Sequence, residues 1–139
     1  MTFTYSPPPV VIDASAAIEM VDGAAGWTDV FAEWAQESRA RLVPLTFFAE
    51  TANGLMRGRA RRSAGQIGLA VRRLLDAGIE VVDRGVAGLV DAIALDEQHN
   101  LTIYDALYLQ LAIDVDGELA TLDRQLRGAA EAEKVALIP

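Results

Sequence analysis

Four acidic side chains of this sequence stand in surroundings where acids are uncommon. Two of them follow short apolar runs typical of buried strands, and the other two lie inside apolar segments typical of helices. A partly buried carboxylate is costly unless it is paired, and only Arg124 adjoins any of the four. Mg²⁺ or Mn²⁺ would compensate such a group, because these ions prefer carboxylate and water oxygens. The four residues, which we predict to be catalytic and metal-ligating, are Asp13, Glu50, Asp105 and Asp123.

Each of these acids also has a simpler structural interpretation. Asp13 and Asp123 could be N-caps of the helices that follow them. Asp105 stands three residues after Thr102, a spacing that resembles a capping box, and Glu50 could lie on a solvated helix stripe. The chemical hypothesis therefore depends on all four acids meeting at one place rather than on any one of them.

Two hydroxyl residues stand two positions from an acid. They form the patterns Asp13-x-Ser15 and Thr121-x-Asp123. Either hydroxyl could support a metal site by hydrogen bonding or could cap a helix. For Ser15 we favour capping of a helix over 16–21, and for Thr121 both interpretations stay open.

The composition narrows the possible chemistry. The chain has 139 residues, no cysteine and one histidine, which excludes a disulfide scaffold, a zinc–thiolate site, a thiol nucleophile and a multi-histidine metal site within one chain. No apolar stretch is long enough to span a membrane, and the first residues do not resemble a signal peptide, so we expect a cytoplasmic protein. Oxygen ligands and carboxylate chemistry are the options that remain.

The elements that must position the acids are short strands alternating with helices. We expect an extended arm over 1–9 and one domain over 10–139. This alternation predicts an α/β fold with a parallel sheet between helical layers, in which sites lie beyond the carboxyl ends of strands. The expected strands are 10–12, 41–43, 79–82, 119–122 and 135–138, and the expected helices are 16–21, 27–34, 45–56, 67–75, 86–98, 103–113 and 124–132.

At the same acids the sequence resembles the PIN-domain ribonucleases, and among them the VapC-type toxins of toxin–antitoxin pairs. The resemblance covers nearly the whole chain in the family order. The segments that carry it are VVIDASAAI at 10–18, FFAETANGLMRGR at 47–59, LTIYDALYLQLA at 101–112 and ELATLDRQL at 118–126.

This resemblance implies a three-layer α/β/α sandwich with a short central parallel sheet. It maps the family's acidic quartet onto Asp13, Glu50, Asp105 and Asp123. It also implies Mg²⁺- or Mn²⁺-dependent endoribonuclease activity, a homodimer, and inhibition by a cognate VapB-like antitoxin protein. We expect no membrane partner.

The net charge of −8 argues against simple non-specific RNA binding and leaves that role to a local patch. The candidate patch, which binds either RNA phosphates or an acidic antitoxin segment, consists of Arg57, Arg59, Arg61 and Arg62. The alternative for this cluster is a solvated helix end. An aromatic stripe, Trp27, Phe31 and Trp34, is expected in the core and otherwise in an antitoxin groove, and His99 is expected at a helix end.

Two other function classes compete with the nuclease hypothesis. The first is a non-catalytic PIN-like binding module that holds RNA or an antitoxin, which intact acids and metal dependence would argue against. The second is a phosphoacceptor receiver or an aspartate phosphatase. A phosphatase needs Asp-x-Asp where this chain has Asp13-Ala-Ser15, and a receiver needs a paired acid that this chain lacks.

Overall fold

The computed structural model describes residues 6–23, 26–58 and 60–138. Its centre is one sheet of five parallel strands in the order β3-β2-β1-β4-β5. Pairing aligns Val10 with Arg41 on one side of β1 and Val11 with Leu119 on the other. The strands are β1 (Val10–Ile12), β2 (Arg41–Val43), β3 (Ile79–Val81), β4 (Glu118–Ala120) and β5 (Leu137–Ile138).

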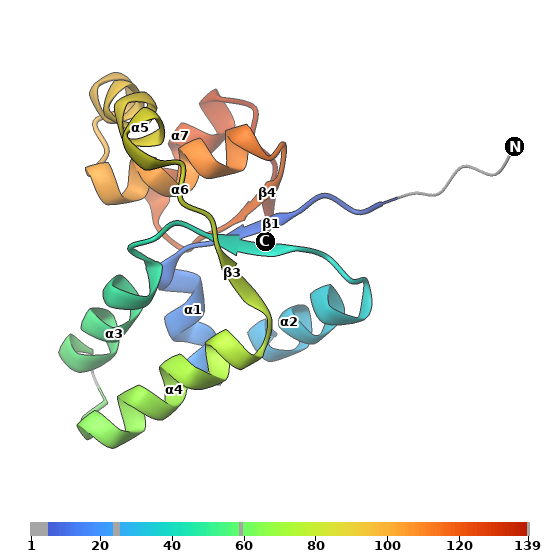
Figure 1. Ribbon diagram of the computed structural model, residues 1–139, viewed down its shortest axis with the longest axis vertical. Coiled ribbons are helices and arrows are strands. Elements are labelled where there is room, and N and C mark those ends of the chain that lie inside the picture. Colours follow the sequence, from blue (N-terminus) through green and yellow to red (C-terminus); the bar gives the residue numbers. More distant parts are fainter. Residues whose placement is uncertain (1–5, 24–25, 59, 139) are drawn as a thin grey trace, which may run out of the picture.

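Helices cover both faces of this sheet (Figure 1). One face carries α1 (Ala14–Val21), α2 (Trp27–Gln36), α3 (Phe47–Arg57) and α4 (Ala64–Asp76). The other face carries α5 (Gly85–His99), α6 (Ile103–Asp114) and α7 (Arg124–Ala132). The predicted three-layer α/β/α sandwich with a central parallel sheet is thereby confirmed.

The core lies where the first strand meets the two helical layers. All three residues of β1 are completely buried, as expected for a β-branched central strand covered on both faces. Helix α6 is apolar nearly all round and buries Ala106, Tyr108, Leu109, Leu111 and Ala112. Trp34 is also buried, so the aromatic stripe is part of the core as predicted, with Trp27 and Phe31 packed partly exposed against it.

Local signals explain most of the helix boundaries. Ser63 and Gln66 form a reciprocal capping box at the start of α4. Asn100 takes the left-handed conformation after α5, at φ 53° and ψ 47°, which is typical of an asparagine that ends a helix. His99 is the last residue of α5, at the predicted helix end, and its Nε2 lies 2.8 Å from Oε1 of Glu133.

Three predicted strands are shorter than the sequence indicates: β3 ends one residue early, β4 ends two residues early, and β5 begins two residues late. Residues 121 and 122 are not part of β4, because the amide of Leu122 donates to the Ser15 hydroxyl rather than to a neighbouring strand. The segment before β5 is shortened because the Val135 amide donates to the Ala130 carbonyl and closes the end of α7.

A close approach between α1 and α3 sets the distance between two elements that carry acids. A Cβ at Gly54 of α3 would collide with Cδ1 of Ile18 on α1. Glycine at this position therefore lets the two helices pack tightly against each other. Of the expected arm, residues 1–5 lie outside the described residues, and the Pro8 carbonyl accepts a 2.8 Å hydrogen bond from Arg39. No helix in the described part of the chain is long and apolar enough to cross a membrane.

Candidate active site

The candidate site lies at the carboxyl edge of the sheet, where the strand order reverses. Strand β1 pairs with β2 on one side and with β4 on the other, although β4 comes much later in the chain. Asp13 directly follows β1, and Asp123 follows β4 after two intervening residues. Parallel α/β sheets form their ligand sites at such a switch point, because the chain diverges there and leaves a crevice.

Asp13 is almost completely buried and both of its carboxylate oxygens accept hydrogen bonds. Oδ1 accepts from the Ser15 hydroxyl at 2.6 Å and from the Ala16 amide at 3.0 Å. Oδ2 accepts from the hydroxyl of Thr121. These bonds fix the orientation of the carboxylate and satisfy it without an ion pair.

The expectation that Ser15 caps the first helix is wrong. Asp13 is the N-cap of α1, which begins at Ala14 rather than 16. Asp13 takes the cap because its backbone is extended, whereas Ser15 already lies inside the first turn. The hydroxyl of Ser15 instead links Asp13 to the Leu122 amide, at 3.0 Å.

Thr121 is not the N-cap of α7, because Asp123 takes that position, and the Thr121 hydroxyl hydrogen-bonds to both acids instead. Its hydroxyl donates to Asp13 and also accepts a 3.1 Å hydrogen bond from the Asp123 amide. One buried side chain thus connects the two acids that follow β1 and β4.

Glu50 reaches the site from the first turns of α3. Its Oε2 accepts from the Thr46 hydroxyl at 2.8 Å and from the Tyr108 hydroxyl at 2.9 Å. Thr46 precedes Glu50 by one helical turn, and Tyr108 comes from α6. Glu50 is half-buried, so it does not lie on a freely solvated stripe.

Asp105 and Asp123 occupy the starts of α6 and α7. Asp123 caps α7 through Oδ1, which accepts from the Leu126 amide at 2.9 Å. The Asp105 amide donates to the hydroxyl of Thr102, which forms only half of the predicted capping box. Capping and site formation are compatible here, because Asp123 caps α7 with one oxygen and its charge still raises the pKa of Asp105.

The four carboxylates lie within electrostatic reach of one another. Burial, and after it the negative charges of Asp123, Asp13 and Glu50, together raise the pKa of Asp105 to about 6. Burial also raises the pKa of Asp13 and that of Glu50, and each feels the charge of another acid of the group. Asp105 is the member whose pKa responds to all three others.

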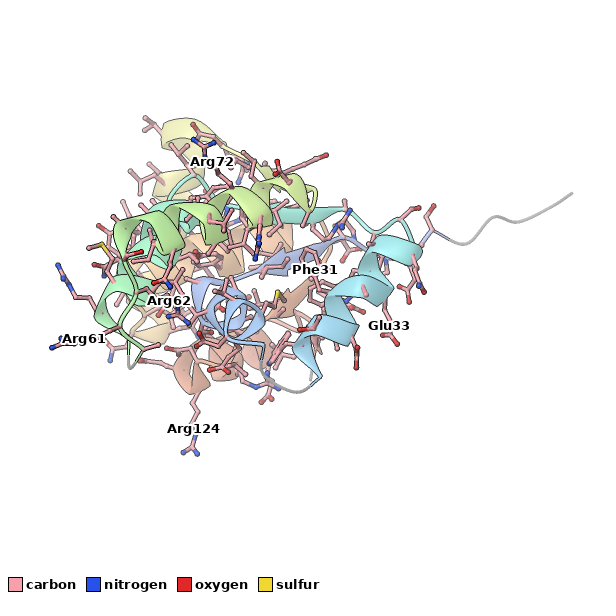
Figure 2. All side chains as sticks on the ribbon, turned by 90° about the horizontal axis from the view of Figure 1, so that it is seen from below. Phe31, Glu33, Arg61, Arg62, Arg72 and Arg124 are labelled. Atoms are coloured by element: carbon pink, nitrogen blue, oxygen red, sulfur yellow. The ribbon has the colours of Figure 1, made fainter. Side chains whose placement is uncertain are left out.

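No positive side chain among the described residues forms an ion pair with these acids. Arg124 follows Asp123 in sequence, but its side chain projects away from the molecule (Figure 2). The excess negative charge suits a divalent cation, because oxygen ligands with this charge are what Mg²⁺ and Mn²⁺ prefer. Across residues 6–23, 26–58 and 60–138, however, no three such side chains are close enough to form a ligand group as they stand.

Two residues that hydrogen-bond to an acid of the site are not predicted from the sequence. They are Thr46 and Tyr108. A threonine before a helix indicates capping, but Thr46 makes no side-chain cap bond and contacts Glu50 instead. Tyr108 stands in an apolar run and looks like a core residue. Its position three residues after Asp105 places both on one face of α6, which is the signal that could have revealed it.

A family model described as a PIN domain matches residues 10–132. The chain belongs to the PIN domain family. The matched region begins with β1 and ends with α7, so it contains every element that supplies an acid to the site.

One relative is similar to this chain in sequence, and two solved structures are similar to it in fold. Ribonuclease VapC3 of Pyrobaculum aerophilum is 55% identical over 38 residues, which is 27% of this chain and only 29% of that relative. PAE2754 from Pyrobaculum aerophilum has a TM-score of 0.72 at 20% identity, covering 94% of this chain and 83% of its own. A chain of a toxin–antitoxin complex from Klebsiella pneumoniae has a TM-score of 0.64 at 17% identity, covering 94% and 96%. At these identities the two structures show a shared fold.

The predicted arginine patch is only partly available on this PIN domain. Arg57 ends α3 and is exposed, and Figure 2 shows Arg61 projecting outward. Arg62 instead turns back and pairs with Asp22 at the end of α1, so its prediction as a phosphate contact is not favoured. Arg59 lies outside the described residues.

A shallow apolar hollow of about 250 Å³ lies on the α1–α4 side of the PIN domain. Phe31 of α2 lines it, together with Met20 of α1 and with Arg73 and Leu74 of α4. Of the aromatic stripe, Phe31 is therefore the member that borders an open surface, whereas Trp34 is enclosed.

Proposed function

We propose that this PIN domain is a metal-dependent endoribonuclease and the toxin of a toxin–antitoxin pair. One observation carries the proposal: four carboxylates from separate elements lie within electrostatic reach of one another near the sheet's switch point, and no cation of the described residues pairs with them. A structural cluster of this kind would be expected to contain a paired Arg or Lys. The resemblance to VapC-type toxins and the name of the Pyrobaculum relative support the same conclusion.

Asp13, Glu50, Asp105 and Asp123 would hold the cation. Mg²⁺ or Mn²⁺, when bound, supplies an activated water and stabilises negative charge at the scissile phosphate. Ser15 and Thr121 orient Asp13, and Thr46 and Tyr108 orient Glu50. In-line attack by water forms a new P–O bond as the 3′ oxygen leaves, so the products carry a 5′-phosphate and a 3′-hydroxyl.

The experiment is RNA cleavage by protein that has been freed of metal with EDTA. Structured cellular RNA should stay intact without metal and be cut when Mg²⁺ or Mn²⁺ is restored, with 5′-phosphate ends. The alternative is a non-catalytic module that holds RNA or an antitoxin. RNA that is bound but left uncut at every metal concentration would establish that alternative and overturn the nuclease.

A cognate VapB-like antitoxin and a cytoplasmic location follow from the toxin proposal. The apolar hollow at Phe31 suits an apolar segment of an antitoxin. A basic side chain from the same partner could neutralise the acids, so Mg²⁺ and the antitoxin should compete. Co-expression with the adjacent reading frame tests this: a complex whose affinity falls as Mg²⁺ rises supports competition, and an affinity independent of Mg²⁺ contradicts it.

We also propose a homodimer, for which α5 offers a surface. Its exposed face carries four apolar side chains at helical spacing, Val86, Leu89, Val90 and Ile93. The first of these is 76% exposed. Leu45 lies beside this face, and Leu45 and Leu89 line a hollow of about 210 Å³. A contiguous apolar surface of this kind is uncommon on a monomer and is typical of an interface between subunits.

A further inference from the structure

Tyr108 is the largest of the completely buried side chains in the described part of the chain. Its side chain is 1% exposed and packs in the apolar core of the protein. A buried phenol needs a partner for its hydroxyl, and this one donates to Oε2 of Glu50 at 2.9 Å. A tyrosine required only to fill space would gain nothing from placing its hydroxyl beside a carboxylate of the site, because phenylalanine has the same ring.

The bond from Tyr108 is one of two to the same oxygen. Thr46 donates to Oε2 from the other side at 2.8 Å, and among the described residues nothing donates to Oε1. Glutamate has three rotatable side-chain bonds, so a free side chain samples many rotamers. Two hydroxyls on Oε2 hold one rotamer and leave Oε1 as the oxygen available to a ligand.

Tyr108 also connects the two helical layers at the site. It belongs to α6, whereas Glu50 belongs to α3 on the opposite face of the sheet (Figure 1). Asp105 lies three residues earlier on the same helix. A single helix therefore contributes one acid of the cluster and fixes the orientation of another.

We propose that Tyr108 is a positioning residue that presents Glu50 to the cation, with Oε1 as the ligating oxygen. This inference rests on the proposed function, because it assigns a role within the same metal site. Groups that orient a metal ligand by hydrogen bonding typically contribute about 10- to 100-fold to metal affinity or activity. Tyr108 acts through Glu50 and touches neither metal nor RNA itself.

The test compares Tyr108→Phe with Tyr104→Phe. Both changes remove only a phenolic oxygen from α6, but Tyr104 is 52% exposed and lies outside the buried network. Mn²⁺ affinity is measured on metal-free protein without RNA, from the electron paramagnetic resonance signal of the free ion. We expect Tyr108→Phe to weaken Mn²⁺ binding by about tenfold and Tyr104→Phe to leave it unchanged.

Kinetics and stability separate positioning from packing. At a fixed, limiting Mn²⁺ concentration, Tyr108→Phe should lower kcat with an unchanged KM for RNA. A lower melting temperature with wild-type Mn²⁺ affinity would overturn the inference, because Tyr108 would then serve stability alone.

Substitutions of Thr46 test the orientation of Glu50 independently, in case Tyr108→Phe fails to fold. Thr46→Val removes the other hydroxyl on Oε2, and Thr46→Ser retains it. The inference expects weaker Mn²⁺ binding for Thr46→Val and near-wild-type binding for Thr46→Ser. Equal affinities for both would overturn it.

Glu50→Gln separates failure of this inference from failure of the proposed function. If wild type and Glu50→Gln bind Mn²⁺ equally, Glu50 is not a ligand, and the proposed metal site is overturned together with the role of Tyr108. If Glu50→Gln loses affinity while Tyr108→Phe and Thr46→Val do not, the metal site stands and only the inference is overturned.

Discussion

The hydroxyl of Thr121 donates a hydrogen bond to Oδ2 of Asp13, joining the residues that follow two adjacent strands. These residues are 108 positions apart in the sequence. We expect Thr121→Val to lower nuclease activity by about 10- to 100-fold, because Asp13 loses one of the groups that orient it. Thr121→Ser keeps the donor and should restore most of the activity. Cleavage rates of a labelled RNA measure both variants, and equal rates for Val and Ser would contradict this role.

Asp13→Asn should lower the rate of RNA cleavage by on the order of 100-fold or more while the protein stays folded. Asparagine can still cap α1, so the loss would come from the missing charge at the site. Asp29→Asn on the exposed surface of α2 is the control with the same chemical change. Initial rates of RNA cleavage and circular dichroism are compared. Full activity of Asp13→Asn at unchanged Mg²⁺ would remove Asp13 from the proposed site.

The metal-free protein should lose stability as the pH rises from about 4 to about 6. The pKa of Asp105 is raised from 3.8 to about 6 in the folded state, first by burial and then by the neighbouring acids. Between these values the folded state binds more protons than the unfolded state, so the free energy of unfolding falls as pH increases. Well above pH 6, the ionised Asp105 destabilises the folded state by its full amount.

Asp105→Asn should therefore stabilise the metal-free protein at pH 7 by on the order of 1 kcal/mol, an effect reduced by the half-buried position of the side chain. At pH 4 the variant and the wild type should be nearly equal. Urea unfolding at both pH values measures this difference. A variant that is less stable than wild type at pH 7 would show that the Asp105 carboxylate is favourably paired.

Replacing Arg57 and Arg61 with Gln should weaken RNA binding and reduce its dependence on salt. Each lost phosphate contact on a single strand lowers the slope of log affinity against log salt by about 0.7, so the double variant should lose about 1.4. The charge-matched control replaces Arg72 and Arg73 on α4, and Figure 2 shows Arg72 on a different part of the surface from Arg61. Fluorescence anisotropy at several salt concentrations gives the slopes. Equal slopes for the two double variants would show that RNA does not bind at the end of α3.

Val90→Glu should convert the proposed homodimer into a monomer, because a charge in the centre of an apolar interface is buried without a partner. Leu69→Glu is the control, since Leu69 is a similarly exposed apolar side chain on α4. Sedimentation velocity distinguishes the two states. A dimer that persists in Val90→Glu would place the interface elsewhere than on α5.

The sequence predicts the layered fold well because its strong signals are local. The β-branched run before Asp13 and the apolar periodicity of the helices identify most elements, and the residues after strands β1 and β4 then converge as parallel topology requires. The end of β4 is less predictable. Its length depends on whether the Leu122 amide bonds to a strand or to Ser15, and that hydroxyl is 107 positions away.

The partners of individual side chains are the part that sequence reasoning misses. Arg62 and Asp22 are 40 positions apart, and nothing near either residue indicates that they pair. Tyr108 and Glu50 are 58 positions apart, on helices that cover opposite faces of the sheet. Such contacts depend on how helices dock, and periodicity gives the face of a helix without its neighbour.

The strand order has a consequence for the folding of this protein during its synthesis on the ribosome. Strand β1 is synthesised before its β4 neighbour, and the Thr121 hydroxyl follows Asp13 by 108 positions in the chain. The proposed site therefore cannot assemble before Asp123 has been synthesised, and a product that terminates earlier should be harmless to its cell. Synthesis itself would therefore delay the activity until the ribosome has passed Asp123.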